Sequence, residues 1–218
     1  MNLVGHVAVA LAPGHADPSS DFLVGCMLPD LAAIARVRIV RPNGELGAGV
    51  EFHHACDVVF HESSWFRHVN PTLRDALLDA GVSTGAARAC SHAGSEMLFD
   101  GALVADERVD GAARRTLGAV DDQADALAAL APVEVRAVFA ERLHLIGASL
   151  EPGRYHDPHF VAERLHRMTL GRRRIELRAS DVDTVALVLG EFAPDIARAA
   201  PGVVADVKKA VPTPLRPA

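Results

Sequence analysis

Apolar residues recur at helical spacing along most of this chain, and short polar or glycine- and proline-containing stretches interrupt them. Residues three or four positions apart share one face of an α-helix, so this spacing predicts amphipathic helices. Typical N-cap residues precede several of these segments. The pattern predicts about seven to nine helices, in the ranges 3–11, 21–37, 48–65, 70–81, 83–105, 110–130, 132–150, 157–170 and 179–200.

The composition also favours a helical fold. Aromatic residues make up only 5% of the chain, which indicates a core of alanine, leucine and valine rather than a sheet of aromatic and β-branched residues. With 218 residues, half of them apolar, the chain can bury a substantial core. We predict an all-α, single-domain helical bundle over residues 1–210, followed by a flexible proline-rich tail at 211–218.

Charge and cysteine content exclude several classes of protein. The formal net charge is −6, which gives no overall attraction to nucleic acid or to an anionic membrane. The start of the chain has no basic segment and too short an apolar run for a signal peptide or a membrane span, so we expect a cytoplasmic protein. Cys26, Cys56 and Cys90 form no CxxC pair and are expected to be buried and free.

Polar side chains gather in the stretch GVEFHHACDVVFHE at 49–62. His53, Asp57 and His61 step by four residues, which places them on one helix face over two turns. Their donor atoms can therefore converge on one cation. His54 points about a hundred degrees away on the same helix. It is expected to be a bystander or a substrate contact.

The segment HAGSEMLFD at 92–100 repeats this spacing with His92, Glu96 and Asp100. Two further candidates lie nearer the start of the chain. His6 is the one polar residue in LVGHVAVAL, and Asp30 ends the apolar run FLVGCMLPD. An ionisable group on an apolar helix is costly to bury unless it is paired or bound to a metal.

Nitrogen and carboxylate donors without thiolates suit Mn²⁺, Fe²⁺ or Zn²⁺, and more than four ligands indicate two ions or an open hydrolytic site. The sequence therefore predicts a metal centre with these ligands: His6, Asp30, His53, Asp57, His61, His92 and Glu96. The alternative is that the helices only expose solvated polar stripes.

The segments MNLVGH, FLVGCMLPD, GVEFHHACDVVFH and SEMLFDGAL, in this order and spacing, resemble the acyl carrier protein phosphodiesterase family. The resemblance covers the first half of the chain and extends loosely over the C-terminal helices. It implies an HD-domain-like helical hydrolase that uses manganese to release 4′-phosphopantetheine from a serine of acyl carrier protein. Carried over by position, it implies a role at the metal site for His6, Asp30, His53 and Asp57, with Glu96 and Asp100 as late carboxylates.

The sequence departs from the family pattern at several positions, and the segment LAAI after Asp30 lacks the family's basic residue and glycine. Cys26 stands for an asparagine, His54 for an arginine, His61 for an aspartate and Gly101 for a histidine. Metal binding is compatible with these changes, because His61 is still a ligand type. The replaced residues are those best suited to hold a phosphate, so the substrate stays open.

The arrangement HxxxDxxxH followed by HxxxE also resembles zinc-dependent phospholipase C and P1-type nucleases, which are helical phosphodiesterases. This second resemblance implies zinc as the metal and a phosphodiester substrate. Those enzymes are usually secreted and use their N-terminal amine as a ligand after signal removal, whereas no signal peptide is recognisable here. A third possibility is a catalytically degenerate metal-binding interaction protein.

We expect one or two Mn²⁺ ions, with Zn²⁺ or Fe²⁺ as alternatives, to activate water for in-line attack on phosphorus. Asp57, Glu96 and Asp100 are the expected catalytic residues, and Asp100 would orient a histidine or the water. An arginine patch could dock acidic acyl carrier protein or clamp a phosphate, or it could be a solvated helix end. The patch consists of Arg164, Arg167, Arg172, Arg173 and Arg174.

Overall fold

The computed structural model describes residues 1–12 and 18–211, and these residues form the predicted all-α fold. They contain ten α-helices, three 3-10 helices and no β-strand. The α-helices are α1 (Leu3–Leu11), α2 (Ser20–Ala35), α3 (Gly44–Glu62), α4 (Ser64–Asp79), α5 (Thr84–Leu103), α6 (Glu107–Asp122), α7 (Ala124–Ala128), α8 (Arg136–Ser149), α9 (Pro158–Thr169) and α10 (Val182–Ala210). The 3-10 helices are η1 (Val133–Val135), η2 (Pro152–His156) and η3 (Ala179–Asp181). The predicted tail, apart from the buried Val211, lies outside the described residues.

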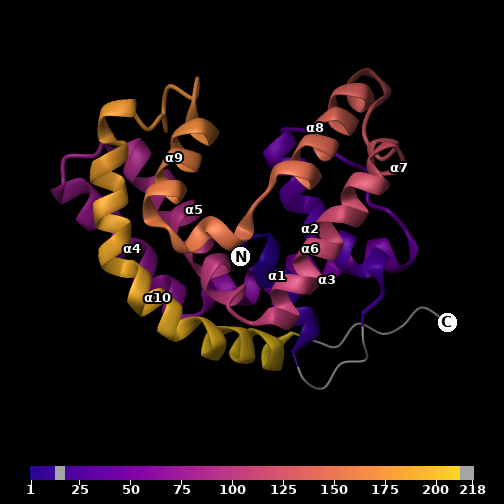
Figure 1. Cartoon of the computed structure of the whole chain (residues 1–218), viewed down its shortest axis with the longest axis horizontal. Coiled ribbons are helices and arrows are strands. Elements are labelled where there is room, and N and C mark those ends of the chain that lie inside the picture. Colours follow the sequence, from indigo (N-terminus) through magenta and orange to yellow (C-terminus); the bar gives the residue numbers. More distant parts are fainter. Residues whose placement is uncertain (13–17, 212–218) are drawn as a thin grey trace.

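The helices form two groups that meet at α1 (Figure 1). One group consists of α4, α5, α9 and α10, and the other consists of α2, α3, α6, α7 and α8. α1 contacts α5 and α10 in the first group, and α2, α3 and α6 in the second. Every residue of α1 except Leu11 is buried. The start of the chain is thus the part that both groups share.

Several predicted helix boundaries were wrong; the last helix, expected to end at 200, continues to Ala210 with Pro201 inside it. The expected helix at 110–130 is interrupted at Gln123, which separates α6 from α7 without a glycine or proline to mark the break. The helix expected from about Asn70 begins instead at Ser64, because the Ser63 hydroxyl accepts a hydrogen bond from the Phe66 amide and caps it. Pro71 lies inside this helix and does not end it.

The core is one contiguous cluster of alanine, valine, leucine and phenylalanine side chains. Cys26, Cys56 and Cys90 are free and buried within it, as predicted. Among the described helices, none is both long and apolar enough to cross a membrane.

A close approach of α2 and α3 sets the distance between two of the predicted metal-site helices. A Cβ atom on Gly49 would lie 2.1 Å from the Phe22 carbonyl oxygen and 2.8 Å from the Cα of Gly25. A Cβ on Gly25 would lie 2.2 Å from the Leu46 carbonyl oxygen. Only glycine therefore fits at either position, and the two backbones touch. His53 follows Gly49 by one turn, so this contact brings its ring to α2.

We expect Gly49→Ala to lower the free energy of unfolding by about 1–3 kcal/mol, because the added methyl group meets backbone that cannot move aside. Gly118→Ala is the matched control, since Gly118 lies in α6 with nothing within 4 Å of an added Cβ. This control should be neutral or stabilising by up to about 1 kcal/mol, because alanine favours a helix. Urea unfolding of both variants measures the difference, and equal effects would contradict the role of the α2–α3 contact.

Candidate metal centre

The first group of potential metal ligands, called here the inner cluster, consists of His6, Asp30 and His53. These residues come from α1, α2 and α3, and one ligand atom of each lies within 4.8 Å of the others. The exposed fractions are 0% for His6 and 3% for His53, so the histidines are shut off from solvent. Three residues far apart in the sequence therefore meet at a buried point, as the metal-site prediction requires.

Hydrogen bonds orient the inner histidines. Nδ1 of His53 donates to the Cys26 carbonyl oxygen at 2.9 Å, which leaves Nε2 facing the carboxylate of Asp57 at 3.3 Å. Nε2 of His6 lies 3.3 Å from the other oxygen of Asp57 and 3.9 Å from Oδ2 of Asp30. A histidine whose Nδ1–H is held by a backbone carbonyl and whose Nε2 faces carboxylates is arranged as metal-binding histidines are.

Two buried polar atoms of the inner cluster lack a hydrogen-bond partner among the described residues. They are Nδ1 of His6 and Oδ2 of Asp30. Burying an unpaired polar atom is unfavourable, and nearly all such atoms in proteins have a partner. A cation bound between Asp30 and the histidines would satisfy the carboxylate oxygen, so the donor set fits a divalent metal ion.

Burial determines the protonation of these groups. It lowers the pKa of His6 to about 3, so this ring is neutral at pH 7 and offers a lone pair. It raises the pKa of Asp30 to about 7, because a carboxylate loses its hydration there. Burial alone would also raise the pKa of Asp57, but hydrogen bonds from His53 and His6 and the charge of the chain's amine hold it well below its usual range.

The second group of potential ligands, the outer cluster, consists of His61 on α3 and of His92 and Glu96 on α5. Oε1 of Glu96 lies 2.9 Å from Nε2 of His61 and 3.3 Å from Nε2 of His92. Nδ1 of His61 donates a hydrogen bond to the Asp57 carbonyl oxygen at 2.9 Å. Nε2 of His61 therefore faces Glu96 in one of two ways: it carries a proton and donates it, or both groups bind one cation. The His61 and His92 rings stack with centroids 5.1 Å apart.

The α-amine of Met1 joins the two clusters, and side-chain patterns gave no sign of it. This nitrogen lies 2.8 Å from Oδ1 of Asp57 and 3.4 Å from Oε1 of Glu96. Burial by itself lowers its pKa, but the charges of Glu96 and Asp57 outweigh that effect and raise it overall. Asp57 belongs to neither group of three, yet through the amine and the two inner histidines it connects them.

The structure places Asp100 apart from both clusters. Its two carboxylate oxygens accept hydrogen bonds from the backbone amides of Val4 and Gly5, at 3.0 and 2.8 Å. These amides are in the first turn of α1, where a helix has no internal partners for them. Asp100 therefore caps and positions the helix that carries His6. Its side chain is fully buried, and burial raises its pKa to about 8.

One departure from the family pattern, Gly101, has a structural basis. A Cβ on Gly101 would lie 2.3 Å from the Tyr155 carbonyl carbon and 2.5 Å from the His156 nitrogen, so no side chain fits where the family has histidine. His54 is exposed, and its ring meets His53 edge-on with centroids 5.2 Å apart. His54 is in neither cluster.

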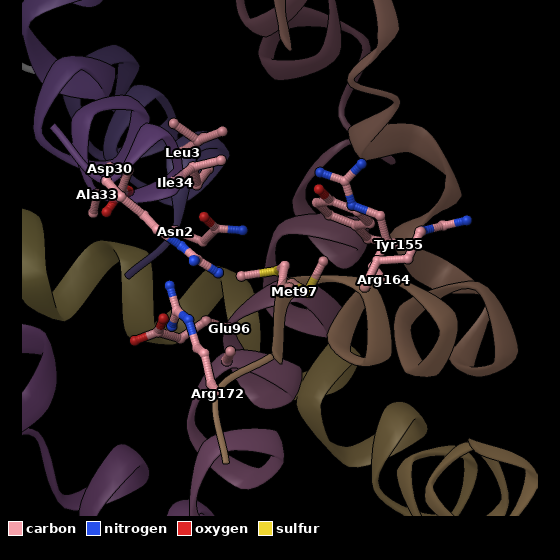
Figure 2. A pocket seen from close by; sticks show the side chains of 14 residues that line it. Asn2, Leu3, Asp30, Ala33, Ile34, Glu96, Met97, Tyr155, Arg164 and Arg172 are labelled. Carbon is pink, nitrogen blue, oxygen red and sulfur yellow. The ribbon is translucent and has the colours of Figure 1, made fainter. Parts of the chain in front are cut away.

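A cleft of about 460 Å³ opens beside both clusters (Figure 2). Asp30 of the inner cluster and Glu96 of the outer cluster are in its wall. The predicted arginine patch divides here, because Arg173 and Arg174 are exposed and do not line the cleft. The arginines that line it are Arg36, Arg164, Arg167 and Arg172.

Comparisons of the chain with protein-family models, with curated proteins and with solved structures gave no match. The arguments about function therefore depend on the geometry of the clusters and the cleft.

We expect the purified protein to bind divalent metal and His53→Ala to weaken that binding by more than about tenfold, the loss found even for residues that only orient a ligand. His54→Ala, its exposed neighbour, is the control and should bind as the unaltered protein does. Because the pKa of Asp30 is raised to about 7, protons compete for this carboxylate and affinity should fall as the pH drops below about 7. Isothermal titration with Mn²⁺ and Zn²⁺ measures both effects, and an unaltered protein that binds neither ion contradicts the assignment.

We expect Asp100→Asn to lower the free energy of unfolding by about 1–3 kcal/mol, because an amide has a single acceptor oxygen for two buried backbone amides. Asp79→Asn, at the exposed end of α4, should change it by less than about 0.5 kcal/mol. Thermal unfolding measures the stability of both variants. If Asp100 instead acted directly in a reaction, its substitution would abolish activity without this loss of stability.

Proposed function

We propose that the protein is a metal-dependent phosphodiesterase whose metal ions bind at the inner and outer clusters. The observation that carries the proposal is that one carboxylate of each cluster lines the same arginine-bordered cleft. Metal ligands that open on a cleft with cationic walls suit a phosphoryl group, since arginine forks pair with phosphate oxygens.

Mn²⁺ is the first candidate metal and Zn²⁺ or Fe²⁺ the alternative, because the donors are imidazole nitrogen and carboxylate oxygen without thiolate. His6, Asp30 and His53 would hold one ion, and His61, His92 and Glu96 a second. Bound there, such an ion would polarise a phosphoryl oxygen and make a water molecule more acidic.

The chain's own residues orient and neutralise the groups of the site. Backbone carbonyls hold the Nδ1 atoms of His53 and His61, so that each Nε2 points inward. The Met1 amine offsets the charges of Asp57 and Glu96. Glu96 also lines the cleft, where the carboxylate oxygen that does not hold the ion would accept a proton from water.

Holo-acyl carrier protein is the first candidate substrate, by the resemblance described above. The inner residues that the resemblance assigns to the metal site, His6, Asp30, His53 and Asp57, lie together. The cleft arginines would then face an acidic protein partner, and the reaction would release 4′-phosphopantetheine.

One observation favours the second candidate, a reaction like that of zinc-dependent phospholipase C and P1-type nucleases. Those enzymes use their N-terminal amine as a metal ligand, and here the Met1 amine lies between Asp57 and Glu96. Both candidates use the same ligand residues. They differ in the metal ion, which is zinc in the second, and in the group attached to the phosphorus of the substrate.

We expect the metal-loaded protein to hydrolyse bis(p-nitrophenyl) phosphate and Glu96→Gln to slow this reaction by about 100-fold or more, as loss of a proton acceptor does. Asp79→Asn, an exposed residue that does not line the cleft, should leave the rate unchanged. The assay follows nitrophenolate release with Mn²⁺, Zn²⁺ or Fe²⁺ in turn.

Three substrates assayed in parallel separate the candidates. Release of phosphopantetheine from holo-acyl carrier protein with Mn²⁺ supports the first, and cleavage of phosphatidylcholine or single-stranded DNA with Zn²⁺ supports the second. A protein that binds metal and turns over none of these substrates would be a metal-binding interaction protein, and the proposal would be wrong.

A further inference from the structure

The cleft beside the metal clusters has two cationic ends. Figure 2 shows Glu96 and Arg172 at one end and Tyr155 and Arg164 at the other, with Met97 between them. Only the first end adjoins the outer cluster, because Glu96 belongs to it. A phosphoryl group at the metals therefore leaves the second end for another part of the ligand.

The cleft arginines lack internal counterions. None of Arg36, Arg164, Arg167 and Arg172 forms an ion pair within the described parts of the chain, although other arginines there do. Asp30 and Glu96 also line the cleft, but they are not counterions of these arginines. Asp30 faces His6, and Glu96 faces His61, His92 and the Met1 amine. The cleft thus carries an excess of positive charge that a ligand can neutralise.

Arg164 is the most confined of these arginines. Its side chain is partly buried, and its Nε has no hydrogen-bond partner among the residues described. It contacts Tyr155, whose exposed fraction is 2%. Burial raises the pKa of Tyr155 to about 12, so its hydroxyl stays protonated and can donate. An unpaired buried guanidinium nitrogen beside a hydroxyl donor is suited to an anionic oxygen.

Gly101 keeps this second end in place. Because any side chain there would collide with the backbone of η2, Gly101 lets η2 pack against α5 and brings Tyr155 to the cleft wall. Leu3, Ile34, Met97 and Met168 add apolar surface to the cleft, and Met97 lies between its cationic ends (Figure 2). The volume of about 460 Å³ is in the range of pockets for small molecules.

We propose that the substrate group bound in this cleft carries a second anion besides the scissile phosphoryl group, and that Arg164 and Tyr155 bind this second anion. The inference rests on the proposed phosphodiesterase function for the first anion. It defines the ligand as a bis-anionic phosphoester with an apolar spacer between its charges, and it makes Arg164 a specificity-determining residue.

Two probes that differ by one carboxylate test this inference. Phenylphosphonate and 4-phosphonobenzoate share a carbon–phosphorus bond that does not hydrolyse, and only the second has an anion at the far end of an apolar ring. Isothermal titration of the Mn²⁺-loaded protein should show 4-phosphonobenzoate binding about tenfold tighter, as a charge-assisted hydrogen bond predicts. Arg164→Gln should remove this difference, and Arg173→Gln, an exposed arginine outside the cleft, should keep it.

Equal affinity of the unaltered protein for the two probes, or binding of neither, overturns the inference. The same titration without metal separates it from the proposed function: both probes should bind more weakly there, but the difference between them should persist. A protein that takes up no metal yet keeps an Arg164-dependent difference supports the second-anion site and rejects the metal centre. If Arg164→Gln unfolds, Arg164→Lys takes its place and should narrow the difference between the two probes, because lysine lacks the guanidinium fork.

Discussion

Three acidic side chains meet at the start of α1, and the structure around them must neutralise their charge. Asp30, Asp57 and Glu96 converge there from three helices, and their charges repel one another in a region with little water. Among the described residues, the groups that offset them are the Met1 amine and four histidines of the two clusters. The amine carries a full positive charge and burial keeps His6 neutral, so a divalent cation between the carboxylates would complete the balance.

The fold supports this concentration of charge by surrounding it with apolar helices. α1 is buried on nearly all sides, α2 and α3 touch through Gly25 and Gly49, and α5 brings Glu96 and Asp100 to the same end of α1. Backbone carbonyls orient the histidines and backbone amides bind Asp100. The side chains that could bind metal thus depend on main-chain groups that no residue pattern displays.

The sequence predicted the helical class from periodicity, and it named all six side chains of the two clusters. His6 and Asp30 stood out as ionisable groups in apolar runs, and the other four followed from the four-residue step. A four-residue step places His53, Asp57 and His61 on one face whatever the rest of the chain does. It could not show that one face serves two clusters, with His53 in the inner and His61 in the outer, since that depends on where α2 and α5 pack. Nor could it give the role of Asp100 in capping α1, because that role arises from a tertiary contact between α5 and α1.

The cap on α1 has a consequence for the order in which the molecule assembles. α1 precedes α5 in the chain, and the carboxylate that binds its first-turn amides lies 96 residues from Val4 in the sequence. A nine-residue segment is also too short to hold a helix by itself in water. The first-turn amides of α1 therefore gain these partners only when α5 packs against the helix. Contacts between residues so far apart in the sequence slow folding.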